Sequence, residues 1–201
     1  MNKWIMAGTA AAFTGAAAFA RSEYERTHLD IVHYDIKTDK LGLEWNGFKA
    51  VFLSDLHDNS FGMKNEELLA AIEKEQPDIV VIGGDMLVVK EWAAPHFDML
   101  ANLYKKLVKR YPVYYAFGNH EQRMKEEPLT YPGWWQSYWK VLKDSGMHVL
   151  VNKSEEIIKN GTAMRISGIT LPRECYRKGR IPSLSAGYID KKIGKASDKN
   201  F

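Results

Sequence analysis

Polar side chains that can bind metal ions follow three apolar stretches of the chain. Asp55 and His57 come after the first stretch, Asp85 after the second, and Asn119 with His120 after the third. Carboxylate, imidazole and amide groups together suit divalent metals of intermediate hardness, such as Mn, Fe or Zn. One carboxylate can bridge two ions, and two ions roughly 3.5–4 Å apart can hold a phosphate and activate a water that attacks it. These residue types therefore predict phosphoester chemistry at a pair of divalent metal ions.

The stretches that precede these residues predict short parallel strands. Residues 48–54, 78–82 and 113–117 are apolar runs, and apolar residues at helical spacing occupy 65–76 and 94–110 between them. Three β-α units in a row predict an α/β layered fold with a largely parallel sheet. The carboxyl ends of the strands form the ligand crevice in open α/β sheets. We therefore expect the five candidate residues to meet at one edge of this sheet.

Glycines accompany two of the three polar clusters. Gly83-Gly84 and Gly118 directly precede candidate ligands, where they let the backbone turn sharply and let a ligand come close. Each cluster alone is a weak signal, because an Asp-x-His pair is usually an ordinary loop. The joint placement of three clusters after three strands is what indicates a site. Asp58 and Glu121 adjoin the candidate ligands, and they either orient the neighbouring histidines or face water.

The second half of the chain predicts antiparallel structure. Residues 134–145 have the pattern of a helix, and Asn160-Gly161 is a strong two-residue turn signal between two strand-like segments. Ahead of the first metal motif, residues 29–36 partly alternate between apolar and polar side chains, which predicts a half-exposed edge strand. After Pro172 the chain is polar and predicts no clear terminal element.

Three blocks of the sequence resemble the first three signature motifs of the calcineurin-like metallophosphoesterase superfamily: Ser54-Asp55-Leu56-His57, Gly83-Gly84-Asp85 and Gly118-Asn119-His120-Glu121. The resemblance runs from about Phe48 to Ile169. In its details it is most similar to the bacterial membrane-associated branch, which is related to phosphodiesterases and UDP-diacylglucosamine pyrophosphatases. The fold that the resemblance implies is a four-layer α/β/β/α sandwich.

The resemblance also implies a role for each candidate residue. Asp55 and His57 would bind the first metal ion, Asp85 would bridge both ions, and Asn119 would bind the second. His120 would contact the substrate phosphate and protonate the leaving group, a step that suits an imidazole near neutral pH. The expected function is a metal-dependent phosphodiesterase or pyrophosphatase that uses direct water attack without a covalent intermediate.

Later histidines that the superfamily uses as ligands have no counterpart in this sequence. The second ion would have only Asp85 and Asn119, fewer ligands than a metal ion needs. Truncation, ligands from a partner and a degraded remnant are the three explanations. We expect truncation, an incomplete sandwich, weak metal binding and slow catalysis; the alternative is a catalytically impaired, membrane-tethered remnant. The remaining histidines are interpreted as surface or packing residues: His28, His33, His96 and His148.

The first residues differ from the rest of the chain. Trp4 to Ala20 carry no charge and are rich in Ala. A cleaved signal peptide, an uncleaved membrane anchor and a buried helix all fit this run. We therefore divide the chain into an anchor or signal segment (1–21), a connector with a first edge strand (22–47) and a metallophosphoesterase domain (48–201). The protein is then expected to be membrane-associated, or exported after signal cleavage.

Composition limits the partners that the chain is expected to have. The formal net charge is only +3 and no Arg-rich stripe occurs, so we expect no nucleic-acid partner. The single cysteine, Cys175, excludes an internal disulfide and a Cys-based zinc cluster. The aromatic segment 131–139 either caps the core or forms an apolar wall that grips a lipid. A lipid-linked phosphoester is therefore one substrate class that the sequence suggests.

Overall fold

Four parallel strands form the central sheet. They are β1 (Ala50–Leu53), β2 (Ile79–Ile82), β3 (Val113–Tyr115) and β4 (His148–Val149), and they lie side by side in that order. Parallel strands need a crossover between them, and helical segments supply the connections. The predicted α/β fold with a largely parallel sheet is therefore confirmed.

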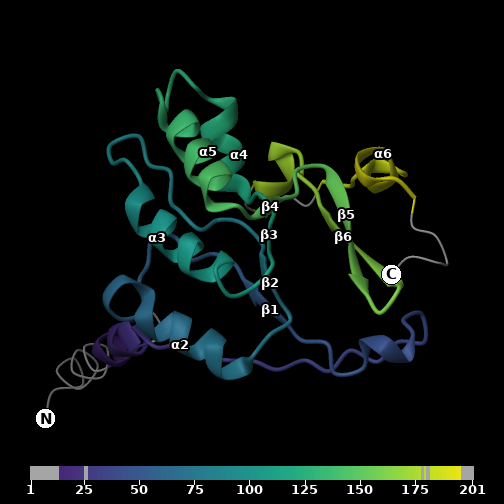
Figure 1. Cartoon of the computed structure of the whole chain (residues 1–201). Helices are drawn as coiled ribbons and strands as arrows, with labels where there is room; N and C mark the ends of the chain where they lie inside the picture. Colours follow the sequence, from purple (N-terminus) through teal and green to yellow (C-terminus); the bar gives the residue numbers. More distant parts are fainter. Residues whose placement is uncertain (1–13, 25–26, 178, 180–181, 196–201) are drawn as a thin grey trace, which may run out of the picture.

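The computed structural model describes residues 14–24, 27–177, 179 and 182–195 of the chain (Figure 1). Residues 14–24 are helical. Most of the predicted anchor or signal segment 1–21 lies outside the described residues. Within the described ranges, no helix has both the length and the apolar character that a bilayer crossing requires.

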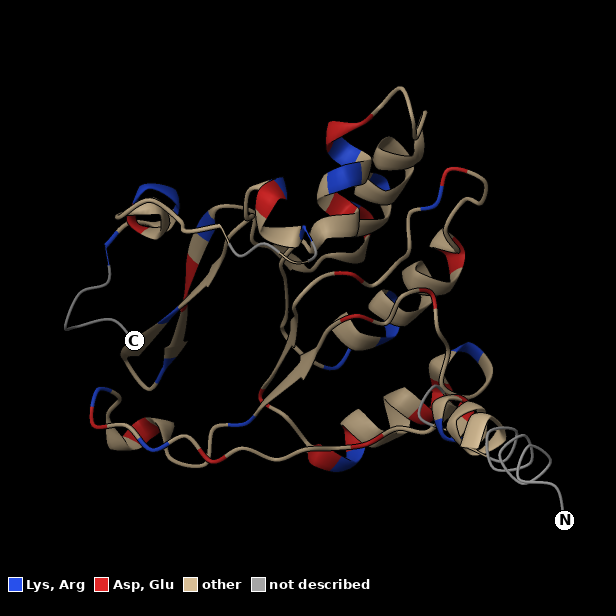
Figure 2. Ribbon diagram, turned by 180° about the vertical axis from the view of Figure 1, so that it is seen from behind, with Lys and Arg blue, Asp and Glu red and all other residues tan. Residues whose placement is uncertain are grey.

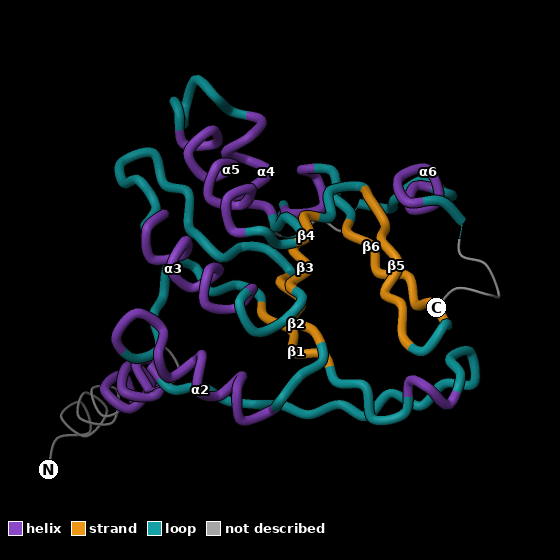
Figure 3. The backbone as a smooth tube through the Cα atoms, in the orientation of Figure 1, coloured by secondary structure: helices purple, strands orange, loops and turns teal. Residues whose placement is uncertain are grey.

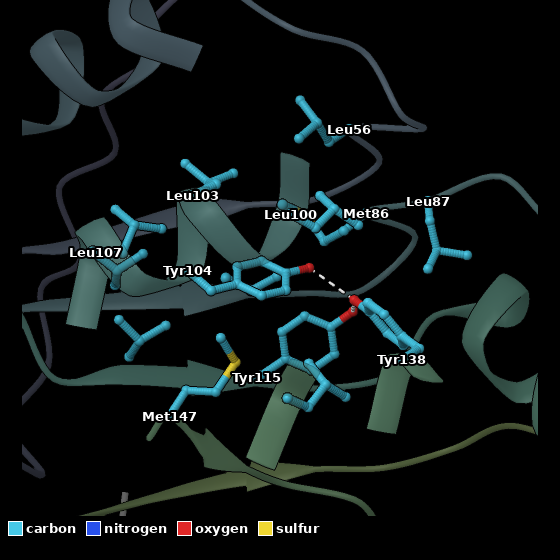
Figure 4. Packing of buried hydrophobic residues seen from close by; sticks show 14 of the residues in the cluster. Leu56, Met86, Leu87, Leu100, Leu103, Tyr104, Leu107, Tyr115, Tyr138 and Met147 are labelled. Carbon is cyan, nitrogen blue, oxygen red and sulfur yellow. Dashed lines mark hydrogen bonds between the residues drawn. The ribbon is translucent and has the colours of Figure 1, made fainter. Parts of the chain in front are cut away.

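Helices cover one face of the sheet. Helices α2 (Glu66–Glu75), α3 (Phe97–Val108) and α5 (Trp134–Ser145) lie together on this side, and α3 packs against α5 (Figures 1 and 3). Their apolar residues recur every three or four positions, so each helix presents a stripe to the sheet. Leu100 (Figure 4) is fully buried in the cluster that results, and so is Leu142. This cluster is the main core of the molecule.

A hairpin and a short helix lie on the other face. Strands β5 (Lys153–Lys159) and β6 (Thr162–Gly168) are antiparallel, and the predicted turn joins them with positive φ at both Asn160 and Gly161. Helix α6 (Tyr188–Ile193) contacts β5 on the side away from the central sheet (Figure 3). From one side of the molecule to the other, the order is helices, sheet, hairpin and helix. This order is the predicted α/β/β/α layering.

Two local predictions are wrong, one before the first strand and one near the end of the chain. Residues 29–36 form no strand, because no strand of the described part of the chain pairs with them, and the side chains of Tyr34 and Ile36 are 82% and 79% exposed. The polar segment after Pro172 is not without structure, since it contains a 3-10 turn, η3 (Arg173–Tyr176), as well as α6. Two further 3-10 turns, η1 (Leu43–Trp45) and η2 (Met63–Asn65), precede β1 and α2. Helix α4 (Asn119–Glu126) follows β3 directly and carries part of the candidate site.

Candidate metal centre

Three candidate ligands meet at the carboxyl edge of the sheet. One ligand atom each from Asp55, His57 and Asp85 lies within 4.8 Å of the other two. The Oδ1 atom of Asp55 and the Nε2 atom of His57 are 3.7 Å apart. Asp55 and His57 are exposed, whereas Asp85 is 8% exposed. The site is therefore open to solvent at Asp55 and His57 and buried in the protein at Asp85.

Backbone hydrogen bonds join the loops that follow β1 and β2. The N–H groups of Asp55 and His57 donate to the carbonyl oxygens of Gly84 and Asp85, each at 3.1 Å. The parallel pairing of the two strands thus continues beyond the sheet into the site. Asp55, His57 and Asp85 all have φ between 51° and 57°, a left-handed conformation that non-glycine residues adopt rarely. Such strain is typical of functional sites, where the surrounding structure enforces it.

Two glycines allow the loops after β2 and β3 to touch. A Cβ atom on Gly84, which has a φ of 95°, would lie 1.9 Å from the backbone nitrogen of Gly118. A Cβ atom on Gly118 would lie 2.4 Å from the carboxyl carbon of Asp85. Both distances are far below any van der Waals contact. The close approach of the Asp85 loop to the start of α4 therefore requires glycine at both positions.

The carboxylate of Asp85 links the β2 loop to the first residues of α4. The side-chain amide of Asn119 donates to Asp85 Oδ2 at 2.8 Å, and the backbone N–H of His120 donates to Asp85 Oδ1 at 2.8 Å. The amide nitrogen of Asn119 serves as this donor, so the amide oxygen is the atom that can bind a metal ion. The structure thus places Asn119 and His120 beside Asp85, as the sequence predicts.

The ring of His120 is oriented by a backbone donor. The N–H of Val89 donates to His120 Nδ1 at 3.0 Å, and the rings of His57 and His120 meet edge to face at 5.3 Å between centroids. An imidazole that accepts at Nδ1 carries its proton on Nε2 when neutral. Burial lowers the pKa of His120, and the negative charge of Asp85 opposes that shift. Both effects of the protein interior on this ring, the Val89 bond and the burial, favour the neutral form.

Glu121 does neither of the two things expected of it. Its side chain is fully buried, so it does not face water, and its oxygens accept hydrogen bonds from backbone groups rather than from His120. Burial raises the pKa of Glu121, whereas hydrogen bonds from the backbone of Asp85 and from Tyr115 lower it. All of its partners are donors, which fits the ionised carboxylate.

Asp58 also differs from the expectation. Its carboxylate accepts hydrogen bonds from the backbone N–H groups of Val88, at 2.9 Å, and His96, at 3.4 Å. The side chain therefore ties the loop after β1 to the connection between β2 and α3. It stabilises the loops around the site rather than the ring of His57.

The donor set fits a divalent metal ion. Two ligand atoms that bind one ion at about 2.0–2.2 Å lie roughly 3–4 Å from each other. The 3.7 Å between Asp55 Oδ1 and His57 Nε2 falls in that range. The combination of two carboxylates and one imidazole suits Mn, Fe or Zn. Ser54 Oγ donates to Asp55 Oδ2 at 2.5 Å, which leaves Oδ1 of that carboxylate directed toward His57.

The other histidines take no part in this group. His33 bonds to Glu75 at 2.9 Å, and His148 bonds to Glu155 at 2.6 Å. Among the residues that the structure describes, Asp55, His57 and Asp85 form the one cluster of at least three His, Cys, Asp or Glu side chains close enough to share an ion.

One residue near the site gives no signal in the sequence. Tyr176, on η3, is 40% exposed, and the burial of the rest of its side chain raises its pKa. The negative charge of Asp85 raises the pKa of Tyr176 further. No motif around Tyr176 predicts an electrostatic interaction with the candidate centre.

An α/β sheet with carboxylate, imidazole and amide groups gathered at its carboxyl edge defines a candidate metal-binding protein. Residues 48–191 match the family model of the calcineurin-like phosphoesterases, so the chain belongs to that family. The Uncharacterized metallophosphoesterase YkoQ of Bacillus subtilis (strain 168) is 32% identical over 117 residues. That alignment covers 58% of this chain and 41% of the relative, so the chain spans less than half of the relative's length. The assignment to a membrane-associated branch stays a prediction.

Proposed function

We propose that the chain is a metal-dependent phosphoester hydrolase whose centre is built on Asp55, His57 and Asp85. The observation that carries the proposal is the convergence of these three donor groups within 4.8 Å in a member of the calcineurin-like family. The residues come from two separate loops, and all three have the left-handed backbone conformation. Two carboxylates at this separation repel each other, and a cation between them would remove that repulsion.

The proposal gives each candidate ligand a role. Asp55 and His57 would bind one ion, and Asp85 would share its carboxylate between that ion and a second one. The amide oxygen of Asn119 would bind the second ion, because its Nδ2 group already donates to Asp85 Oδ2. When bound, the ions would supply a water activated for attack and a positive charge that stabilises the phosphoryl oxygens. The metals that fit are Mn, Fe or Zn.

His120 would hold the substrate phosphate. The bond from the Val89 N–H occupies Nδ1, so the neutral ring presents Nε2–H as a hydrogen-bond donor. Proton transfer to the leaving group would need the imidazolium, in which both ring nitrogens are donors and the bond from Val89 is lost. The contact to a phosphate oxygen is therefore the better supported of the two roles expected for this residue.

Turnover of model phosphoesters tests the proposed function. The purified chain is incubated with Mn²⁺ and either bis(p-nitrophenyl) phosphate, a diester, or p-nitrophenyl phosphate, a monoester. We expect hydrolysis that EDTA abolishes and that Mn²⁺ restores. Manganese binding without hydrolysis of either ester would contradict the proposed enzymatic activity and would support a metal-binding protein instead. The absence of both binding and hydrolysis would remove the metal centre itself.

A lipid-linked substrate is the finer part of this proposal. The half-buried Trp135 and Trp139 stack on each other at 5.4 Å and meet Phe117 edge to face, so the core contact expected of the aromatic segment is present. What supports a lipid contact is the exposure of Trp92, 83%, and Leu129, 97%, in the connections that follow β2 and α4. Replacing both with Ser should reduce turnover of a phosphoester presented in vesicles but not of a water-soluble diester. If the variant turned over the vesicle substrate as fast as the original chain, the proposal of a lipid-linked substrate would be contradicted.

A further inference from the structure

We propose that Glu121 is a positioning residue whose carboxylate fixes the Asp85 loop against the start of α4, and so sets the metal-binding geometry. This inference rests on the proposed function, because it concerns the same centre. Glu121 lies on the first turn of α4, directly after His120, yet its side chain points into the protein and is fully buried. Glu121 is thus a buried acid beside the candidate centre and is not one of the proposed metal ligands.

Each oxygen of Glu121 accepts two hydrogen bonds. Oε2 accepts from the backbone N–H of Asp85 and from that of Gly118, both at 2.9 Å. Oε1 accepts from the N–H of Met86 at 3.2 Å and from the hydroxyl of Tyr115 at 2.8 Å. A carboxylate has about four lone-pair positions, so this one is fully used. Oε2 therefore bonds at once to the β2 loop, through Asp85, and to the loop after β3, through Gly118.

The bond to Asp85 acts where the backbone is strained. Asp85 has a φ of 51°, and its side chain is the group placed between both proposed ions. The conformation places its N–H toward Glu121 and its carboxylate toward Asn119 and His120. Loss of the acceptor would leave buried N–H groups without a partner, and the loop would move to satisfy them. A displaced loop would take the Asp85 carboxylate away from His57.

Three buried tyrosines extend the contact into the core. Tyr115 bonds to Tyr138 at 2.6 Å, and Tyr138 bonds to Tyr104 at 2.7 Å, with the hydroxyls directed at one another (Figure 4). Each hydroxyl has one proton, and Tyr115 uses its proton on Glu121. Tyr138 must therefore donate to Tyr115, and Tyr104 to Tyr138. All three dipoles point toward the carboxylate, and such aligned bonds strengthen one another.

This chain of groups connects the site to four elements. Tyr104 lies on α3, Tyr115 on β3, Tyr138 on α5 and Glu121 on α4. All four side chains are fully buried, so water does not compete for the bonds. The helix-covered core thereby holds the backbone of the candidate centre through one continuous line of hydrogen bonds.

The test compares two phenylalanine variants of adjacent residues. Tyr115→Phe removes the hydroxyl that donates to Glu121. Tyr114→Phe removes a hydroxyl from the same strand but on the opposite face of the sheet, where Tyr114 stacks on His148. Glu121→Gln is the stronger change, because its amide N–H₂ would face another donor. Manganese affinity is measured by calorimetric titration of the full chain, and thermal melting checks that each variant is folded.

Manganese affinity should fall about 10–100-fold in Glu121→Gln and about tenfold in Tyr115→Phe, the usual range for groups that orient metal ligands. Tyr114→Phe should stay within about twofold of the original chain. Folded Glu121→Gln and Tyr115→Phe variants that bind manganese as well as the original chain would overturn the proposal. An equal loss in Tyr114→Phe would also overturn it, since the effect would then be general. If Glu121→Gln does not fold, the tyrosine pair decides.

Amide hydrogen exchange separates this proposal from the proposed function. The exchange of the Asp85, Met86 and Gly118 amides is followed by NMR without added metal. It should become faster in Tyr115→Phe but not in Tyr114→Phe. If the original chain binds no manganese, the proposed metal centre fails, and this exchange pattern alone decides whether Glu121 positions the loops. Unchanged exchange at all three amides would then overturn the positioning role as well.

Discussion

The two faces of the central sheet are packed very differently. On the helix-covered face, alternate residues of β2 and β3, such as Val80, Ile82 and Tyr115, are fully buried in a large apolar cluster. On the hairpin-covered face, the buried cluster consists of Ile79, Tyr114 and Leu150. Figure 2, seen from behind, shows charged residues of both signs interspersed over the elements on both sides of the sheet. The difference between the faces therefore lies in apolar burial rather than in charge.

The candidate centre belongs to the better packed side. Leu56 lies between the candidate ligands Asp55 and His57, and Met86 follows Asp85 (Figure 4). Phe117 precedes Gly118-Asn119, and all three apolar side chains are part of the helix-side cluster. On the hairpin-side face, by contrast, Phe52 is 66% exposed. The comparison teaches that the site takes its rigidity from the helix-side core. Changes on that side should disturb the centre, and changes on the hairpin side should spare it.

The largest effect is expected at the contact between the loop after β2 and the loop after β3. Gly84→Ala should destabilise the fold by more than about 4 kcal/mol, because the new Cβ would overlap backbone atoms of Phe117 and Gly118 that cannot rotate away. Gly146→Ala is the matched control. Gly146 also has a positive φ, of 82°, but open space lies where its Cβ would go, so we expect a cost of only about 1 kcal/mol. Urea denaturation measures both, and similar costs would contradict the close approach.

A second prediction compares the two faces directly. Leu142→Ala, on α5, should cost about 3 kcal/mol, because it removes a fully buried side chain from the helix-side cluster. Ile166→Ala, on β6, should cost less than about 1.5 kcal/mol, because Ile166 is only partly buried against the smaller cluster. Urea denaturation of both variants gives the comparison. If Ile166→Ala cost as much as Leu142→Ala, the two faces would not differ in stability as their packing indicates.

A third prediction concerns metal binding rather than folding. Asp85→Asn should weaken manganese binding about 100-fold, or ~2.7 kcal/mol, because it removes the charge that the two proposed ions share. Asp78→Asn makes the same change at the other end of β2, where the carboxylate accepts from the N–H of Lys49. It should leave manganese affinity unchanged in the same calorimetric titration. A comparable loss in Asp78→Asn would mean that general electrostatics, not a local site, controls binding.

The meeting of the candidate ligands at one edge could be predicted because topology alone decides where strand ends lie. Once β1, β2 and β3 are parallel and adjacent, the residues after each strand must share an edge, whatever the details of packing. The contacts of Glu121 could not be predicted from the sequence. Its carboxylate accepts hydrogen bonds from the backbone of Asp85, which is 36 positions away, and of Met86, which is 35 positions away. No side-chain pattern marks which backbone N–H groups a buried carboxylate will meet.

Local patterns failed where structure depends on a distant partner. Residues 29–36 alternate as a strand would, but a strand also needs a neighbour to accept its hydrogen bonds, and none lies beside them. The turn at Asn160-Gly161 was predictable for the opposite reason. Its conformation depends on two residues that tolerate positive φ, and both adopt it. A conformation that depends on a few adjacent residues can be predicted from the sequence. A strand that needs a distant neighbouring strand cannot be predicted in this way.

The smallest effect is expected on the hairpin side, from the pH dependence of an exposed ion cluster. Hydrogen bonds from Lys153 and His148 lower the pKa of Glu155, against an opposing effect of burial. A carboxylate whose pKa is lower in the folded state binds fewer protons folded than unfolded, so it contributes stability above its unfolded pKa of about 4.3. This contribution is lost as the pH falls through the folded pKa, and solvent screening limits it to less than about 1 kcal/mol.

Replacing Glu155 with Gln should therefore make the chain less stable near pH 6, and this loss should be smaller near pH 3. Glu156→Gln is the control, because successive residues of a strand point to opposite faces and Glu156 lies away from this cluster. Urea denaturation at both pH values measures the difference. The manganese affinity of Glu155→Gln should equal that of the original chain, because the hairpin side does not hold the ligand loops. Weaker manganese binding in this variant would contradict the conclusion that the hairpin side of the sheet does not affect the candidate centre.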